Sequence, residues 1–291
     1  MDITSLLIQV LNAVQYGLLL FLVASGLTLV FGMMRIINLA HGSFYMLGAY
    51  AAFVLTSMTG SLALAIALGV PLALAFGAAL EWLLFARLYQ RDHLEQVLLT
   101  YGLILIFEDL RSLAVGDDVH GVPIPALLRA SIALNETLSY PVYRIVVSVA
   151  CIAIAGGLYL LIRRTRLGMM IRAGSHDRDM IQSLGVNIDL LYRIVFALGV
   201  ALAALAGMLA APISSVFPDM GSQVLIVSFV IVVIGGIGSV WGAFLASLLV
   251  GFADTFGKVL LPDFAGLAVY GVMATALLLR PQGIFGKKVG S

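Results

Sequence analysis

The sequence predicts an all-α membrane protein: a polytopic bundle of eight or nine transmembrane helices, some broken or half helices, with a cytoplasmic C-terminus. Of its 291 residues, 62% are hydrophobic and only 11% charged, whereas a soluble domain is roughly 45–50% apolar and about 25% charged. Charge-free runs are long, since Arg35 and Glu81 enclose 45 residues, enough for two crossings of about 20 residues each. Residues 62–76 are apolar on every face, which favours helices over the alternating strands of a barrel.

The charge-free runs divide into nine expected crossings. Two of them, 36–58 and 222–236, are interrupted by glycines, and the second is short, so either is a candidate half-helix or re-entrant segment. This leaves eight or nine spans open. The expected crossings lie near residues 6–34, 36–58, 61–86, 96–115, 142–162, 192–217, 222–236, 239–257 and 263–279.

The chain is expected to form a single transmembrane domain over residues 1–291. Its longest polar stretches, 87–95, 116–141 and 163–191, are only loop-sized. The N-terminus lacks a basic region, so no cleavable signal peptide is expected. A net charge of +1 gives nucleic-acid binding no electrostatic support.

The distribution of basic residues predicts the orientation. With nine crossings and the N-terminus outside, the inside loops hold twelve of the sixteen lysines and arginines, six of them between residues 163 and 193. Because short cytoplasmic loops are rich in Lys and Arg, the loop 163–191 and the C-terminus are expected to be cytoplasmic, and the loop 116–141 periplasmic. If the segment 36–58 does not cross the membrane, the N-terminus lies on the opposite side, and the later loops keep the sides given above.

The loop 163–191 contains the signals of a short amphipathic helix. Asp177 is a candidate N-cap and Gly185 a candidate C-cap. Between them, Met180, Ile181 and Leu184 are expected to share one face. Such a helix suits insertion into a groove of a partner protein, and the simpler interpretation is an interfacial helix anchored to lipid headgroups.

Two further segments combine glycines with polar residues. Arg35, Asn38 and His41 are three residues apart and stack on one helical face, which indicates a pore or an interface; the simpler interpretation is an ordinary loop, a cap and a packed histidine. The glycines of 235–242 resemble the Gly-Ser and Gly-Ala steps of 42–49, which suggests a repeat whose helix breaks mark a substrate path. The candidate path residues or helix breaks are Asn38, His41, Gly42, Ser43, Gly235, Gly236, Gly238 and Ser239.

The sequence contains no candidate residues for enzymatic catalysis or for a metal site. His41 has no second ligand-type residue at metal spacing, and no Ser/His/Asp arrangement or Gly-x-Ser-x-Gly elbow occurs. We therefore expect no catalytic residue and no metal site. Carboxylates near the helix ends are candidates for a proton relay, but helix ends also reach water. They are Glu81, Glu108, Asp109 and Asp254.

The sequence resembles a known family. Gly26-Leu-Thr-Leu-Val-Phe-Gly-Met-Met-Arg-Ile-Ile-Asn-Leu-Ala-His-Gly-Ser-Phe-Tyr-Met-Leu-Gly-Ala-Tyr50 looks like the opening of the LivH-type permease subunit of branched-chain amino acid ABC importers. The segments 172–187, 229–243 and 279–286 are also similar to this family. The resemblance covers roughly residues 10–286, in order and without a large insertion.

The resemblance implies an assembly in the bacterial inner membrane. The chain would pair with a second, LivM-like permease subunit, bind two cytoplasmic ATPase subunits, and receive leucine, isoleucine or valine from a periplasmic binding protein. ATP and Mg²⁺ would be bound by the ATPases, because this chain has no Walker A sequence; no cofactor is expected in the chain itself. Other amino acids, amides or urea are alternative substrates, and an ion-coupled secondary transporter is a less favoured alternative function.

The resemblance also implies where the ATPases attach. The segment around 177–185 would be the coupling helix, and Gly185 fits the glycine of the wider importer motif, although the loop lacks that motif's Glu-Ala-Ala run. The expected coupling residues are Arg172, Ala173, Asp177, Met180, Ile181, Leu184 and Gly185.

Overall fold

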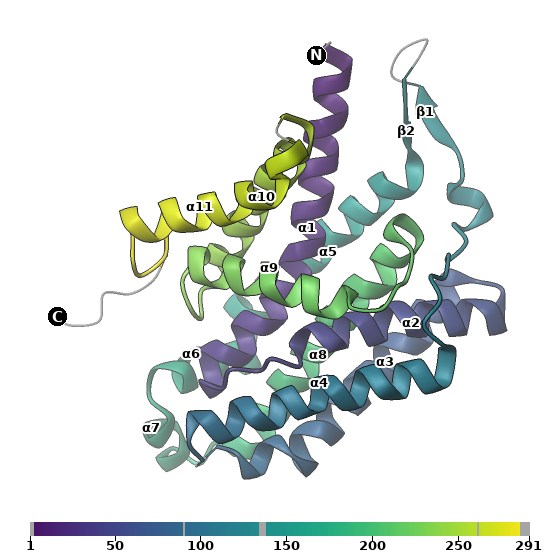
Figure 1. The fold of residues 1–291 in the computed structure, drawn as a ribbon. Coiled ribbons are helices and arrows are strands. Elements are labelled where there is room, and N and C mark those ends of the chain that lie inside the picture. Colours follow the sequence, from purple (N-terminus) through teal and green to yellow (C-terminus); the bar gives the residue numbers. More distant parts are fainter. Residues whose placement is uncertain (1–2, 90, 134–137, 261, 286–291) are drawn as a thin grey trace.

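The computed structural model describes residues 3–89, 91–133, 138–260 and 262–285, which are predominantly helical (Figure 1). Lys287 and Lys288, two of the basic residues used to orient the C-terminus, lie outside the described residues. The α-helices are α1 (Ile3–Met34), α2 (His41–Thr59), α3 (Leu62–Leu83), α4 (His93–Val115), α5 (Val142–Arg164), α6 (Arg166–His176), α7 (Arg178–Ser183), α8 (Ile188–Ser214), α9 (Met220–Gly235), α10 (Val240–Leu260) and α11 (Ala265–Leu279). The short elements are η1 (Phe85–Arg87), η2 (Ala126–Leu128), η3 (Pro262–Phe264), β1 (Ser131–Ala133) and β2 (Ser139–Pro141).

Each expected crossing corresponds to one helix, with ends shifted by a few residues. Five helices of the described chain are long and apolar enough to cross a membrane, and α9 and α11 are apolar but shorter. The all-α membrane fold is thereby confirmed, while the number of crossings stays a prediction. The five candidate spans are Ile3–Met34, Leu62–Arg87, Val142–Arg164, Ile188–Ser214 and Val240–Leu260.

Helices α1 and α8 form the centre of the bundle. In their most apolar windows, 89% of α1 and 78% of α8 is buried, compared with 22% for the span of α3 and 17% for α5. Helices that are apolar on all sides and buried on all sides belong to an interior. The peripheral helices leave large apolar side chains such as Leu72 and Leu113 exposed, as expected for surfaces that face lipid.

The helix order α1–α2–α3 recurs as α8–α9–α10. Helix α1 packs along α10, and α8 packs along α3 in the corresponding way. Both long helices end at a residue other than glycine with a positive φ, Arg35 at 54° and Ser215 at 60°, a conformation that such residues adopt rarely. The shorter helices α2 and α9 then start at a mutual contact, where a Cβ on Gly42 would lie 2.2 Å from the Gly221 carbonyl oxygen.

This repeat corrects the internal alignment suggested by the sequence. Gly42-Ser43 lies in the first turn of α2 and corresponds to Gly221-Ser222 in the first turn of α9, not to Gly238-Ser239. Gly238-Ser239 precedes α10 as Gly60-Ser61 precedes α3, and both glycines have positive φ. Ser61 and Ser239 both cap the helix that follows. The motif Gly-Ser therefore occurs at two different kinds of helix start, and for this reason the motif alone suggests the wrong pairing of 42–49 with 235–242.

The two ends of the bundle carry different connections. Figure 1 shows α6 and α7 at one end, beside the end of α1, and the β1–β2 hairpin at the opposite end. The hairpin is antiparallel, with Ser131 opposite Pro141, and belongs to the loop 116–141, of which 134–137 lie outside the described residues. The predicted cytoplasmic and periplasmic loops are thus at opposite ends of the molecule.

Candidate functional site

The loop 163–191 folds into two helices rather than the single short helix that the sequence indicates. Thr165 begins α6, because its hydroxyl accepts a hydrogen bond from the Gly168 amide (3.1 Å). Asp177 ends α6 and begins α7, and its carboxylate accepts from the Met180 amide at 2.9 Å. The predicted cap at Asp177 is confirmed, but α6 was missed, although Thr165 is itself an N-cap signal.

The end of α7 is a glycine turn. Gly185 has a φ of 84°, a left-handed conformation that glycine adopts without steric cost. Its amide donates to the Gln182 carbonyl, and the Val186 amide donates to Ile181, so two carbonyls of the helix end are satisfied. The glycine C-cap predicted for this helix is confirmed.

The apolar side chains of α7 point in two directions. Met180 and Leu184 are 51% and 74% exposed, whereas Ile181 is 3% exposed. The expectation that all three share one face is therefore wrong, since Ile181 packs inward toward Gly174 of α6. The exposed pair at positions i and i+4 forms a small apolar knob at the tip of the segment.

Contacts to α5 hold the segment in place. The Arg172 guanidinium, although exposed, donates to the Ile162 carbonyl near the end of α5. Half-buried Ala173 lies in the last turn of α6, and its carbonyl accepts from the Asp177 amide. Gly168 allows the tight turn, because a Cβ there would lie 2.2 Å from the same Ile162 carbonyl oxygen. The segment is thereby joined closely to the end of α5.

A buried carboxylate joins the helices beneath this segment. Glu81 of α3 is fully buried and pairs with Arg193 of α8, with 3.1 Å between Arg193 Nε and Glu81 Oε2. Its other oxygen accepts from the Tyr89 hydroxyl. Burial, together with the hydrogen bond and charge of Glu81, raises the pKa of Tyr89, so the phenol keeps its proton as the donor.

Tyr89 extends this connection to α7. Its ring meets Tyr192 of α8 edge-on with 4.8 Å between centroids, and the Arg178 guanidinium lies 5.4 Å from the Tyr192 centroid. A continuous set of contacts therefore runs from Arg178 on α7 to Glu81 on α3. The sequence alone indicates Glu81 only as a proton-relay candidate, because its partner Arg193 is 112 residues away.

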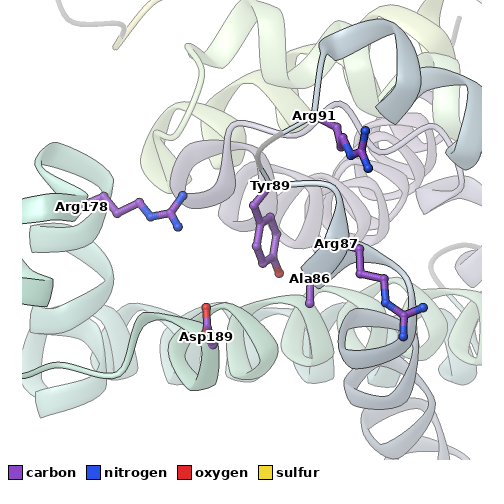
Figure 2. Close-up of a pocket in the computed structure, with 6 residues that line it drawn as sticks. All are labelled: Ala86, Arg87, Tyr89, Arg91, Arg178 and Asp189. Carbon is purple, nitrogen blue, oxygen red and sulfur yellow. The ribbon is translucent and has the colours of Figure 1, made fainter.

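A polar cleft of about 480 Å³ opens at this end of the bundle. Figure 2 shows Tyr89 between Arg178 on one side and Arg87 and Arg91 on the other, with Asp189 rising from α8. The lining residues come from η1, from the segment between η1 and α4, from α7 and from α8. It consists of Ala86, Arg87, Tyr89, Arg91, Arg178 and Asp189.

The predicted path residues at the start of α2 lie in the protein core. Asn38 precedes the helix, in the non-helical segment 35–40, so the expected helical stack of Arg35, Asn38 and His41 is wrong. Asn38, His41 and Ser43 are at most 3% exposed. His41 Nε2 lies 2.9 Å from the Val23 carbonyl oxygen, and Asn38 accepts from the Ala40 amide. Gly42 is covered by Gly221. None of them lines the cleft described above, and their role in a path stays a prediction.

The second predicted set brings helices into close contact. A Cβ on Gly235 would lie 2.4 Å from the Gly242 carbonyl carbon, and Gly238 approaches Gly32 of α1. Gly236 and Gly238 have φ values of 93° and 79° and form the break between α9 and α10. Ser239 caps α10 by accepting from the Gly242 amide. The break is confirmed, while its part in a path stays a prediction.

A second cluster of contacts, at the opposite end of the bundle, is not predicted by the sequence. Arg111 donates to the Gly116 carbonyl and to Asp117 at 2.9 Å, and its guanidinium lies 5.4 Å from the Tyr50 ring centroid. His120 stacks on Phe53 and pairs its backbone with Val216. The hydrogen bonds and charge of Arg111, with a hydrogen bond from Ser112, lower the pKa of Asp117. The loop after α4 is thereby fastened to α2 and to the end of α8.

Comparison with known proteins identifies the relatives of this architecture. A family model described as "Branched-chain amino acid transport system / permease component" matches residues 9–279. The chain is 31% identical to the high-affinity branched-chain amino acid transport system permease protein BraD of Pseudomonas aeruginosa, over 96% of this chain and 95% of that protein. It is 28% identical, with the same coverage, to the corresponding protein LivH of Escherichia coli. Similarity extends to LivM of Salmonella typhimurium, at 28% identity over 89% of this chain and 66% of that protein.

Proposed function

The chain belongs to the branched-chain amino acid permease family, and from this premise we propose that it is the inner-membrane permease subunit of an ABC importer for leucine, isoleucine and valine. The observation that carries the proposal is the family match over residues 9–279 together with near full-length similarity to BraD and LivH. The apolar spans of the described chain fit a multi-pass membrane protein. The chain catalyses no reaction of its own and acts as a transport subunit.

The complete importer requires further subunits. A LivM-like second permease is supported by the similarity of this chain to LivM. Two cytoplasmic ATPase subunits bind ATP and Mg²⁺, and a periplasmic binding protein delivers the amino acid. Nine crossings place the N-terminus outside and the C-terminus inside, with α6 and α7 on the cytoplasmic side.

The mechanism is alternating access driven from α7. ATP binding closes the ATPase pair and draws the α7 segments of the two permeases together, and the permease halves then rock about the substrate path. Motion of α7 reaches the bundle through Arg178, Tyr192 and Tyr89, whose contacts end on Glu81. The close contacts between α5 and α6 link the segment to the membrane helices in this proposal.

Met180 and Leu184 are the contacts with the ATPase groove in this proposal. The exposure of these two side chains in an otherwise polar segment supports this assignment, because an exposed apolar pair contributes most to binding when a partner protein buries the pair. Burial of each side chain contributes about 1.5–3 kcal/mol. The double variant Met180→Glu/Leu184→Glu is therefore expected to weaken ATPase association by at least about ten-fold.

Co-purification of the ATPase subunits with the tagged chain measures this association. Met169→Glu, an equally exposed methionine on α6 (53%), is the matched control and should retain the ATPase. Both variants should insert into the membrane normally. Association that survives the double substitution would refute the assignment of α7 as the coupling element.

A further inference from the structure

The cleft of Figure 2 has an excess of positive charge. Arg178 lines one side of the cleft and Arg87 and Arg91 line the other, and Asp189 is the one carboxylate among the lining residues that the structure describes. The nearest acidic group to Arg91 is Glu95, at 3.8 Å and largely exposed, so this pair is weak. Guanidinium groups bind phosphate oxygens in pairs, and the cleft is thus suited to a phosphate group.

The position of the cleft specifies the kind of phosphate. Arg87 is the last residue of the apolar span that begins at Leu62, so the cleft lies at the depth where lipid headgroups begin. Next to it the ends of α3 and α4 present large exposed apolar side chains, and Trp82 is 62% exposed; tryptophan is enriched at this boundary. The exposed residues are Trp82, Leu83, Leu94 and Leu98.

We propose that this cleft binds the phosphate of an anionic phospholipid headgroup, while the acyl chains lie along the exposed faces of α3 and α4. A phospholipid combines a phosphate with apolar chains, and the surface combines three guanidinium groups with apolar helix faces. Free phosphate would use only the first of these features. The site goes beyond the transport function, since it involves neither the substrate nor the apolar knob formed by Met180 and Leu184.

Bound lipid would stabilise the connection between α7 and the bundle. Arg178 comes from α7, whereas Arg87 and Arg91 come from the connection between α3 and α4 on the other side of Tyr89, so a headgroup held in the cleft would lie between the two segments. Asp189, in the first turn of α8, opposes the anion. Removal of this carboxylate is therefore expected to strengthen binding rather than weaken it.

Trp82 provides the probe for a direct test. The chain has two tryptophans, so a Trp241→Phe background leaves only Trp82, beside the cleft. The purified full-length chain is reconstituted in phosphatidylcholine vesicles with increasing brominated phosphatidylglycerol, and Trp82 fluorescence quenching is compared with that by brominated phosphatidylcholine. We expect phosphatidylglycerol to be preferred by roughly five-fold or more, on the order of the contribution of one arginine at an anionic surface.

Matched variants separate this cleft from general surface charge. Arg87→Gln/Arg91→Gln/Arg178→Gln is expected to abolish the preference, and Asp189→Asn to increase it. Arg163→Gln/Arg164→Gln/Arg166→Gln removes the same charge from the nearby α5–α6 junction and should keep the preference. Equal quenching by the two lipids, or equal losses in both triple variants, would overturn the proposal.

Two further arms test other occupants. Inorganic phosphate, added at constant ionic strength, should leave the preference unchanged; if it removes the preference, the cleft is a free-phosphate site and the lipid proposal is wrong. Addition of the co-purifying ATPase subunits should likewise leave it unchanged. If the added ATPase subunits remove the preference for phosphatidylglycerol, the cleft is a protein interface and the proposal is wrong.

Discussion

Glu81 anchors the end of the bundle that carries α6 and α7. Its side chain is completely buried, and both oxygens are occupied, by Arg193 of α8 and by Tyr89. A buried carboxylate is stable only when it is paired and hydrogen-bonded. Because both oxygens serve these contacts, we interpret Glu81 as a structural anchor and not as a proton carrier.

Glu81→Gln should therefore destabilise the protein. Glutamine has nearly the same volume but leaves the Arg193 guanidinium without its counter-charge, at a cost of about 1–3 kcal/mol. The midpoint of thermal unfolding in detergent should fall. Glu95→Gln is the control, since the pair of Glu95 with Arg91 is exposed and long and contributes about 0–1 kcal/mol. Equal midpoints for the two variants would contradict the role given to Glu81.

The ion pair of Arg111 and Asp117, at the opposite end of the bundle from Glu81, predicts that the stability of the protein depends on pH. Hydrogen bonds from Arg111 and Ser112 lower the pKa of Asp117 below its ordinary 3.8. The unfolded chain therefore binds this proton more readily than the folded one, and the contribution of Asp117 to stability is fully present above its unfolded pKa. It is lost as the pH falls from about 4 through the lowered pKa.

Thermal unfolding as a function of pH measures this contribution. The unfolding midpoint of wild type should be higher than that of Asp117→Asn by a constant amount near neutral pH. This difference in midpoint should shrink below about pH 4. Asp118→Asn changes the neighbouring carboxylate and is the control. A margin that widens on acidification would contradict the ion pair.

Among the elements, helices α2 and α9 are tightly constrained at the point where each begins. Gly42 and Gly221 bring the first turns of the two helices into backbone contact. Such close approach requires residues without a side chain, as in other membrane helices. The contact lies at the centre of the repeat and fixes how its two halves meet.

Gly42→Ala should therefore be destabilising. The new Cβ would lie 2.2 Å from the Gly221 carbonyl oxygen, so the helices must separate, at a cost of about 1–3 kcal/mol. Gly156→Ala in α5 is the control with the opposite sign: a Cβ there meets nothing within 4 Å, and alanine gains about 0.5–1 kcal/mol of helix propensity. The two unfolding midpoints should move in opposite directions. A Gly42→Ala variant as stable as wild type would contradict the contact.

Hydropathy and capping predict the elements well and their partners poorly. The crossings at 96–115 and 142–162 match α4 and α5 because apolar runs bounded by charges define helix ends locally. Asp177 and Gly185 act as predicted for the same reason. The orientation of Ile181 and the pairing of Glu81 with Arg193 depend on which helices become neighbours, and helical periodicity does not contain that information.

For the whole molecule, the scarce charges are more informative than the abundant apolar residues. The segment between residues 163 and 193 holds six of the sixteen basic residues. It folds at the end of the bundle opposite the β1–β2 hairpin (Figure 1). The arrangement of charge therefore distinguishes two ends of an otherwise apolar bundle, and it identifies the end where we propose that soluble ATPase subunits bind.

The central claim is that this chain transports branched-chain amino acids only as part of an ATP-driven assembly. The most direct measurement is uptake of labelled leucine into proteoliposomes that contain the chain with its second permease, its ATPase subunits and its binding protein. We predict uptake that requires ATP and every subunit, and neither uptake nor ATP hydrolysis by the chain alone. Leucine accumulation by the chain alone, driven by an ion gradient, would contradict this account.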